Sequence, residues 1–141
     1  MNERKLKAVV CLPTRNERES ISDMIDRIKA LKLPLFISDE QSTDGTLEIA
    51  KKKQVEVFQR DGSGKGAGVQ KAVEIARKRG FDVLVIIDCD CTYPPEYIPK
   101  LLARMPKYDM VVGARRMKDV TWGHQLPNMF FTVLIDLLFL G

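Results

Sequence analysis

Two aspartates, Asp88 and Asp90, directly follow an apolar run over residues 83–87. Five consecutive β-prone apolar residues predict a strand that is buried on both faces. Two carboxylates one residue apart at the end of such a strand would reach outward from the same edge of a sheet. Carboxylate oxygens, with room left for phosphate oxygens, are ligands that suit Mg²⁺ or Mn²⁺. The pair therefore predicts a divalent-metal site, and its ordinary alternative is an acidic pair in a solvated turn.

The composition limits the class of protein. The chain has 141 residues, of which 45% are hydrophobic and 30% charged, so one folded domain with its own core is expected. Its net charge of +4 is spread along the sequence without a dense basic tract, which gives no reason to expect a nucleic-acid partner. The three cysteines, Cys11, Cys89 and Cys91, are odd in number and indicate reduced thiols; with the single His124 they make a poor zinc set.

No stretch of the sequence predicts a membrane span or a signal peptide. Residues 1–7 are polar and basic, and the longest apolar segment, 129–140, is short and interrupted by Asp136. That segment could lie in a membrane interface or pack on a core. A cytoplasmic protein is expected, with a peripheral contact at the cytoplasmic face of a membrane as a further expectation.

Strand and helix patterns alternate along the chain. Strands are predicted over 8–12, 34–37, 55–58, 83–87 and 109–112. A first helix is expected to start near Asn16, with Glu19 completing a capping box, a second at Ser42 or Thr43, a third around 69–76 and a fourth at Pro94. This order predicts right-handed βαβ units and therefore an α/β fold with a mostly parallel sheet flanked by helices.

Polar clusters follow the predicted strands, one after each. They occupy residues 13–17, 39–44, 60–68, 88–90 and 113–116. Open parallel sheets bind ligands beyond the carboxyl ends of their strands, so the clusters converge on one predicted site. Within it, Glu17 and Asp39 could accept hydrogen bonds from ribose hydroxyls and a base N–H, and Arg115 could bind a phosphate. Alternatively, Glu17 is an acid favoured in the first turn of a helix, Asp39 a turn residue and Arg115 an ordinary solvated arginine.

A glycine-rich segment follows the third predicted strand. Gly62, Gly64, Gly66 and Gly68 would let the backbone approach a ligand, and Lys65 adds a positive charge. The segment is neither a P-loop, because glycine follows Lys65 where serine or threonine should stand, nor the Gly-x-Gly-x-x-Gly fingerprint of dinucleotide-binding folds. A flexible loop is the alternative interpretation.

Taken together, these motifs resemble the family 2 glycosyltransferases with a Rossmann-like GT-A fold. Within that family they are most similar to the dolichyl-phosphate (polyprenyl-phosphate) mannosyl- or glucosyltransferases. The matching strings are Pro13-Thr14-Arg15-Asn16-Glu17, Asp39-Glu40-Gln41-Ser42-Thr43-Asp44-Gly45-Thr46, Gly64-Lys65-Gly66-Ala67, Asp88-Cys89-Asp90 with Pro94-Pro95-Glu96, and Gly113-Ala114-Arg115. They occur in the family's order and cover roughly residues 6–116.

The resemblance implies roles for individual residues. It implies a nucleotide-sugar-binding core over 1–116, followed by the start of an acceptor-side segment over 117–141. The residues implied in substrate binding are Pro13, Thr14, Arg15, Glu17, Asp39, Gln41, Lys65, Gly66, Asp88 and Arg115. Asp88, Asp90 and Thr92 are implied as ligands of Mg²⁺ or Mn²⁺, and Asp90 and Arg115 as catalytic residues.

The sequence departs from the family pattern at three places. Glu40-Gln41 replaces the usual Asp-Gly, Thr92 stands where these enzymes tend to carry a metal-binding glutamine, and Tyr93 replaces a usual histidine. Family members also continue beyond the point where this sequence stops, at Gly141. The resemblance therefore implies a catalytic-domain fragment or a truncated relative.

The expected reaction is inverting transfer of a hexose from a GDP-mannose-type or UDP-glucose-type donor to a polyprenyl or dolichyl phosphate. A lipid phosphate is already an anionic nucleophile, whereas a hydroxyl acceptor would need a general base. The alternatives are a truncated inactive nucleotide-sugar-binding protein or partner subunit, and a family 2 transferase acting on a saccharide hydroxyl. A haloacid-dehalogenase-type phosphatase also matches Asp88-x-Asp90-x-Thr92, but no paired acids follow that motif.

Overall fold

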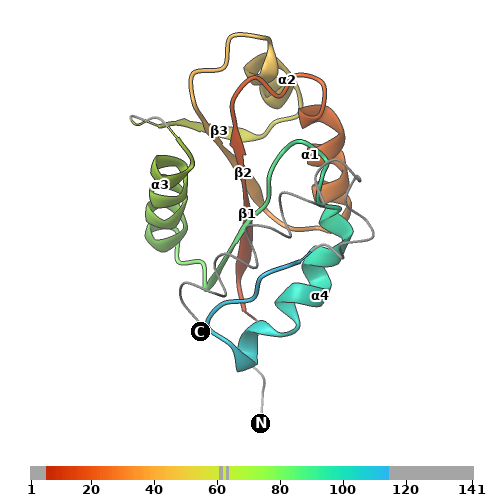
Figure 1. Cartoon of the computed structure of the whole chain (residues 1–141), viewed down its shortest axis with the longest axis vertical. Coiled ribbons are helices and arrows are strands. Elements are labelled where there is room, and N and C mark those ends of the chain that lie inside the picture. The colour runs from red at the N-terminus through yellow and green to blue at the C-terminus, as the bar shows by residue number, and fades with distance from the viewer. Residues whose placement is uncertain (1–5, 61, 63, 115–141) are drawn as a thin grey trace, which may run out of the picture. The chain divides into compact units, whose positions relative to one another are not determined.

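The computed structural model describes residues 6–60, 62 and 64–114 (Figure 1). The chain divides into two compact units, Met1–Val111 and Val112–Gly141. Every helix and strand named below belongs to the first unit.

The described residues form one parallel four-stranded sheet with the strand order β3-β2-β1-β4. The strands are β1 (Ala8–Thr14), β2 (Leu35–Asp39), β3 (Glu56–Gln59) and β4 (Val83–Ile86). The register places Thr14 beside Asp39 and Asp39 beside Gln59, so β1, β2 and β3 end on the same line. The predicted α/β fold with a parallel sheet is confirmed.

Helices cover both faces of this sheet (Figure 1). They are α1 (Ile21–Ala30), α2 (Thr46–Lys52), α3 (Lys65–Lys78) and α4 (Ile98–Leu102), with 3-10 turns at Pro95–Tyr97 and Met105–Lys107. Helices α1, α2 and α4 contribute buried side chains to one core cluster, and α3 contributes to a second.

The alternation of side chains along β1 explains the two layers. Val10 and Leu12 are fully buried in the first cluster, whereas Val9 and Cys11 are buried in the second. Successive residues of a strand point to opposite faces, so a strand covered on both sides is apolar at every position. Four apolar residues of α1 at helical spacing complete the first cluster: Ile21, Met24, Ile25 and Ile28.

The fifth predicted strand does not form. Residues 109–112 have no strand conformation, and Met110 is 74% exposed. A strand requires a partner for its backbone N–H and C=O groups, but among the described residues β4 pairs with β1 alone. Apolar, β-prone residues were therefore insufficient to predict a strand here.

Across the described ranges, no helix is long and apolar enough to cross a membrane. The predicted apolar segment 129–140 lies outside these ranges.

Candidate functional site

The loops that follow β1 and β2 are tied together by hydrogen bonds. The backbone N–H of Asn16 donates to Ser42 Oγ at 2.9 Å, and that of Thr43 donates to Asn16 Oδ1 at 2.9 Å. The backbone N–H of Glu17 donates to Thr46 Oγ1 at 2.9 Å. Polar side chains of one loop thus satisfy backbone donors of the other, which fixes the two loops against each other.

This arrangement corrects the predicted start of the first helix. Asn16 has a φ of +57°, and its side-chain oxygen accepts a hydrogen bond from the backbone N–H of Thr43, so Asn16 does not cap the helix. Helix α1 begins four residues later than a cap at Asn16 would place it, after Ser20, whose hydroxyl donates to Glu17 Oε2 at 3.0 Å. A capping-box pattern was outcompeted by a contact between segments 27 residues apart.

The carboxylate of Asp39 lies at the end of β2 and is fully buried. Its Oδ1 accepts hydrogen bonds from Thr14 Oγ1 at 3.0 Å and from Ser42 Oγ at 2.5 Å. Its Oδ2 accepts from the backbone N–H of Ser42 at 2.9 Å and from Gln59 Nε2 at 3.2 Å. Burial of a carboxylate requires such donors. A ligand N–H could reach Asp39 only by taking the place of one of them.

Glu40, the next residue, meets three donors from separate segments. Its carboxylate accepts a hydrogen bond from Arg15 at 3.3 Å, one from the backbone N–H of Gly64 at 3.3 Å, and one from Arg60. The side chains of Arg60 and Glu40 are 5% and 14% exposed, respectively. Arg60 follows β3 and Gly64 precedes α3, so this carboxylate connects the ends of β2 and β3 to the start of α3.

The acidic pair lies on the loop after β4. Cys89 is buried in the first core cluster, whereas its neighbour Asp90 is exposed, so the cysteine anchors the loop and the aspartate projects from it. Asp90 Oδ1 accepts a hydrogen bond from the backbone N–H of Thr92 at 2.9 Å, which closes a tight turn. Cys91 adopts a φ of +58° within that turn.

A bidentate ion pair holds the far end of the same loop. Arg27 of α1 donates from Nε to Glu96 Oε1 at 2.7 Å and from NH2 to Oε2 at 2.6 Å. This pair lowers the pKa of Glu96 to about 2, with the hydrogen bonds from Arg27 as the main cause. Two parallel bonds to one carboxylate fix orientation as well as distance. The loop from β4 to α4 is thus fastened at Cys89 and at Glu96.

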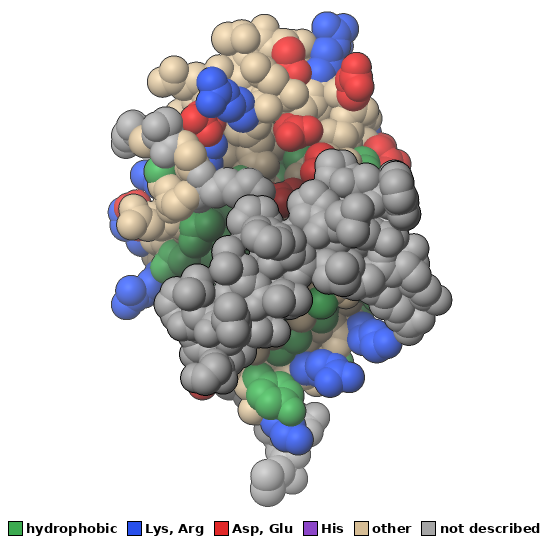
Figure 2. Space-filling view, in the orientation of Figure 1, with side chains coloured by type: hydrophobic (Ala, Val, Ile, Leu, Met, Phe, Trp, Pro, Cys, Tyr) green, Lys and Arg blue, Asp and Glu red, His purple; other side chains and the backbone are tan. Residues whose placement is uncertain are grey.

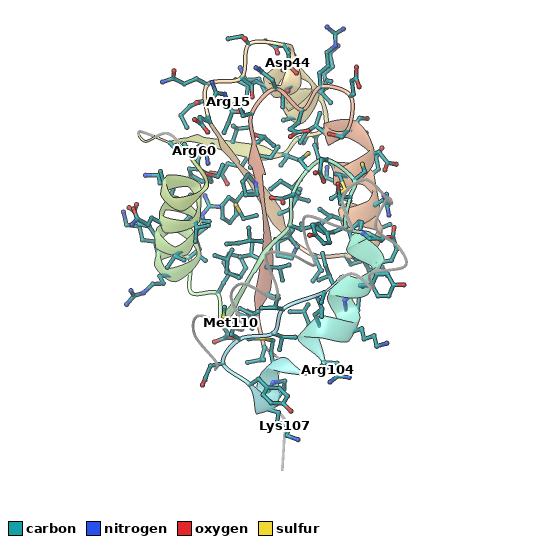
Figure 3. The ribbon with its side chains drawn as sticks, viewed as in Figure 1. Arg15, Asp44, Arg60, Arg104, Lys107 and Met110 are labelled. Atoms are coloured by element: carbon teal, nitrogen blue, oxygen red, sulfur yellow. The ribbon has the colours of Figure 1, made fainter. Side chains whose placement is uncertain are left out.

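One cavity of about 250 Å³ brings most of these groups together. Its lining consists of Pro13, Thr14, Arg15, Glu17, Glu40, Arg60, Gly64, Asp88, Cys89 and Asp90. Glu17 and Asp90 also line a wider hollow of about 570 Å³ beside the loops that follow β1 and β2. Figure 3 shows Arg15, Asp44 and Arg60 at the same end of the molecule, where acidic and basic side chains stand together in Figure 2.

The predicted site residues divide into three groups. Six of them line this cavity: Pro13, Thr14, Arg15, Glu17, Asp88 and Asp90. Asp39, Gln41 and Thr92 belong to the same loops and strand ends, and Gly66 lies in the first turn of α3, but none of the four is among the lining residues. Arg115 and the side chain of Lys65 lie outside what the structure describes.

Sequence reasoning missed Glu40 and Arg60 as cavity residues. Glu40 was noted only within the polar cluster 39–44 and as a departure from the family pattern, and Arg60 only as the first residue of the polar cluster 60–68. Their charges were visible in the sequence, but their burial and their pairing over 20 positions were not.

The acidic pair suits Mg²⁺ or Mn²⁺ bound together with phosphate. No group of three or more histidine, cysteine or acidic side chains that could hold a metal occurs in the part of the chain that the structure describes. Mg²⁺ is commonly bound through one or two protein carboxylates plus substrate phosphates and water. Asp88 and Asp90 both line the cavity and provide that number of carboxylates.

The fold is a GT-A glycosyltransferase fold. Glucosyl-3-phosphoglycerate synthase from Mycobacterium tuberculosis, solved in complex with Mn²⁺, UDP and glucosyl-3-phosphoglycerate, matches 72% of this chain and 40% of that one. The TM-score is 0.64 and the sequence identity 26%. The chain belongs to glycosyl transferase family 2, whose sequence model matches residues 9–139.

Curated relatives point to one branch of this family. The chain is 34% identical over 127 residues to a dolichol-phosphate mannosyltransferase of Pyrococcus furiosus, covering 80% of this chain and 34% of the relative. It is 33% identical over 132 residues to an undecaprenyl-phosphate mannosyltransferase of Micrococcus luteus, covering 83% of this chain and 53% of the relative. The chain thus spans between a third and about half the length of these two relatives. The predicted resemblance to family 2 glycosyltransferases of this kind is confirmed.

Proposed function

We propose that this chain carries the donor site of a glycosyltransferase that moves a hexose from a nucleotide-diphosphate sugar to a polyprenyl phosphate. The observation that carries the proposal is the cavity in which Asp88 and Asp90 of the loop after β4 meet Pro13 at the end of β1 and Glu17 in the loop after it. Crevices at the carboxyl ends of parallel strands are where α/β folds bind nucleotides. The choice of acceptor is supported by the two relatives, which are a dolichol-phosphate and an undecaprenyl-phosphate mannosyltransferase.

The proposed roles follow from position. Pro13 and Glu17, at the end of β1 and in the loop after it, would contact the nucleoside, and Asp39 would support that wall from behind through Thr14. Asp88 and Asp90 would hold Mg²⁺ or Mn²⁺, which when bound offsets the negative charge that builds on the departing diphosphate. Arg115, which the sequence assigns to a phosphate, lies outside the described residues.

The proposed acceptor suits the chemistry of the site. A phosphate monoester carries its own negative charge and can attack the anomeric carbon without a general base, with inversion of configuration. A saccharide hydroxyl would instead need a carboxylate positioned to remove its proton. A polyprenyl phosphate presents its head group at a membrane surface, so we propose that the protein works at the cytoplasmic face of a membrane.

A transfer assay tests this function. The chain is incubated with Mn²⁺, dolichyl phosphate in detergent and labelled GDP-mannose or UDP-glucose, and the organic phase is counted. The proposal predicts labelled lipid with one of the donors and its loss in Asp90→Asn. Nucleotide binding without labelled lipid would instead favour a donor-binding protein that lacks transferase activity.

A further inference from the structure

Arg60 carries a buried positive charge whose hydrogen-bonding capacity is only partly used. Its side chain is 5% exposed. The NH2 group bonds to Glu40, but neither Nε nor NH1 has a hydrogen-bond partner among the described residues. Leaving two guanidinium nitrogens buried without acceptors costs free energy, so their presence in a native fold requires an explanation, of which a bound anion is one. Arg60 lines the same cavity as Asp88 and Asp90.

The surroundings of Arg60 already accommodate an anion. Glu40 takes hydrogen bonds there from three donors, namely Arg15, Arg60 and the backbone N–H of Gly64. Gly64 is the N-cap of the 14-residue helix α3, whose first turn contains no acidic residue. The positive end of the helix dipole and two guanidinium groups therefore converge on one carboxylate. At this carboxylate two positive side chains face one negative side chain, whereas Glu17, Asp88 and Asp90 make the rest of the cavity lining acidic.

Gly68 of α3 makes room for the guanidinium. A Cβ atom built on Gly68 would collide with Arg60 NH1, so a side chain at position 68 would make the guanidinium shift. The absence of a side chain at Gly68 therefore leaves room for Arg60 in its present position.

We propose that Arg60 is a phosphate-binding residue of the donor site, whose guanidinium would turn from its buried position to contact the diphosphate that Asp88 and Asp90 would hold through a divalent ion. This assignment rests on the proposed function and extends it. Guanidinium groups recognise phosphate oxygens through paired N–H donors, a geometry that lysine cannot supply. Glu40 then acts as an internal counter-ion that competes with the ligand for Arg60.

A purely structural pair between Arg60 and Glu40 would behave differently. In that case removal of either partner would disturb the loop in the same way, and both variants would bind a diphosphate more weakly. If Arg60 contacts the ligand, the two variants have opposite effects. Arg60→Gln removes a ligand donor, whereas Glu40→Gln removes a competing negative charge but keeps an acceptor for the guanidinium.

The experiment is calorimetric titration of the whole chain with UDP, GDP and inorganic pyrophosphate in the presence of Mn²⁺. Arg60→Gln is expected to raise the dissociation constant for the bound diphosphate by about tenfold or more. Glu40→Gln is expected to lower this constant. Arg60→Lys and Gly68→Ala are expected to raise it while keeping the net charge. Arg104→Gln is the control, because it removes one positive charge at the opposite end of the molecule (Figure 3). Circular dichroism verifies the fold of each variant.

The outcomes separate this inference from the function on which it rests. Binding by the wild type with unchanged affinity in Arg60→Gln would overturn the role of Arg60 and leave the donor site standing. Equal weakening in Arg60→Gln and Glu40→Gln would also overturn it, in favour of a structural pair. Failure of Arg60→Gln to fold would leave the decision to Arg60→Lys and Gly68→Ala, and wild-type affinity in both would refute the proposal. No binding of any probe by the wild type would overturn both proposals.

Discussion

Thr14 and Asp39 end neighbouring parallel strands at the same level of the sheet, and the Thr14 hydroxyl donates a 3.0 Å hydrogen bond to the Asp39 carboxylate. Both residues are at least 98% buried. Thr14 lines the cavity and Asp39 stands behind it, so this bond joins the cavity wall to the polar network of the loop after β2. The stability of the site therefore depends on a hydroxyl donor at position 14.

Thr14→Val tests that dependence. The substitution preserves shape but removes a donor to a buried carboxylate, and we expect the free energy of unfolding to fall by about 1–3 kcal/mol. Urea denaturation measures the change. Thr43→Val is the matched control, since Thr43 is exposed and its change should stay within about 0.5 kcal/mol. Equal effects of the two substitutions would show that the Thr14 hydroxyl contributes nothing special.

The ion pair between Arg27 and Glu96 predicts a pH dependence of stability. The folded-state pKa of Glu96 is about 2, below its ordinary value of 4.5, so its contribution is present above pH 4.5 and is lost as the pH falls toward 2. Because the Glu96 side chain is 52% exposed, solvent screening limits that contribution to about 1 kcal/mol.

Unfolding of Glu96→Gln and wild type should therefore be compared at several pH values. The wild type is expected to be more stable at pH 7, with the difference disappearing near pH 2. A difference that stays constant from pH 7 to pH 2 would contradict the role assigned to this carboxylate.

Gln41 has a φ of +51°, a left-handed conformation that costs a residue with a side chain roughly 1–2 kcal/mol. Glycine adopts it freely but gains entropy in the unfolded chain, so Gln41→Gly should raise the unfolding free energy by roughly 0.5 kcal/mol. Gln54→Gly, at a φ of +54° after α2, should behave alike. Thermal unfolding of both variants checks this, and destabilisation by Gln41→Gly would mean that its side chain makes a contact of its own.

The three thiols should differ in reactivity. Burial raises the pKa of Cys11 to about 12 and that of Cys89 to about 12, whereas Cys91 is only partly buried and its pKa is raised chiefly by desolvation. Since the thiolate is the reactive form, iodoacetamide at pH 8 should label Cys91 first. Mass spectrometry of the peptides measures the order. Labelling of Cys89 as fast as Cys91 would contradict the anchoring of the acidic loop in the core.

The parallel sheet could be predicted from the sequence because β1 and α1 each have a recognisable pattern of apolar residues over a few neighbouring positions. Val9, Val10, Cys11 and Leu12 form a continuous apolar run, as a doubly covered strand requires, and the spacing from Ile21 to Ile28 specifies one buried helix face. Residues 109–112 were mispredicted because a strand also needs a neighbouring backbone, which no local pattern reports.

For the site, the sequence predicted which loops converge but not how each side chain is used. Glu17, Asp88 and Asp90 were identified from their place after predicted strands, and all three line the cavity. The pairing of Arg60 with Glu40 and the use of Asn16 to tie two loops depend on contacts over 20 residues or more. Such contacts follow from tertiary packing, so only the structure reveals them.

We propose above all that the cavity is a metal-dependent donor site. The most direct test is the affinity of the chain for UDP and GDP, measured by calorimetry with and without Mn²⁺, in the wild type and in Asp90→Asn. We predict that one nucleotide binds, that Mn²⁺ strengthens this binding at least tenfold, and that Asp90→Asn abolishes the Mn²⁺ effect with the fold intact. Binding that is indifferent to Mn²⁺, or an Mn²⁺ effect that survives Asp90→Asn, would contradict the claim.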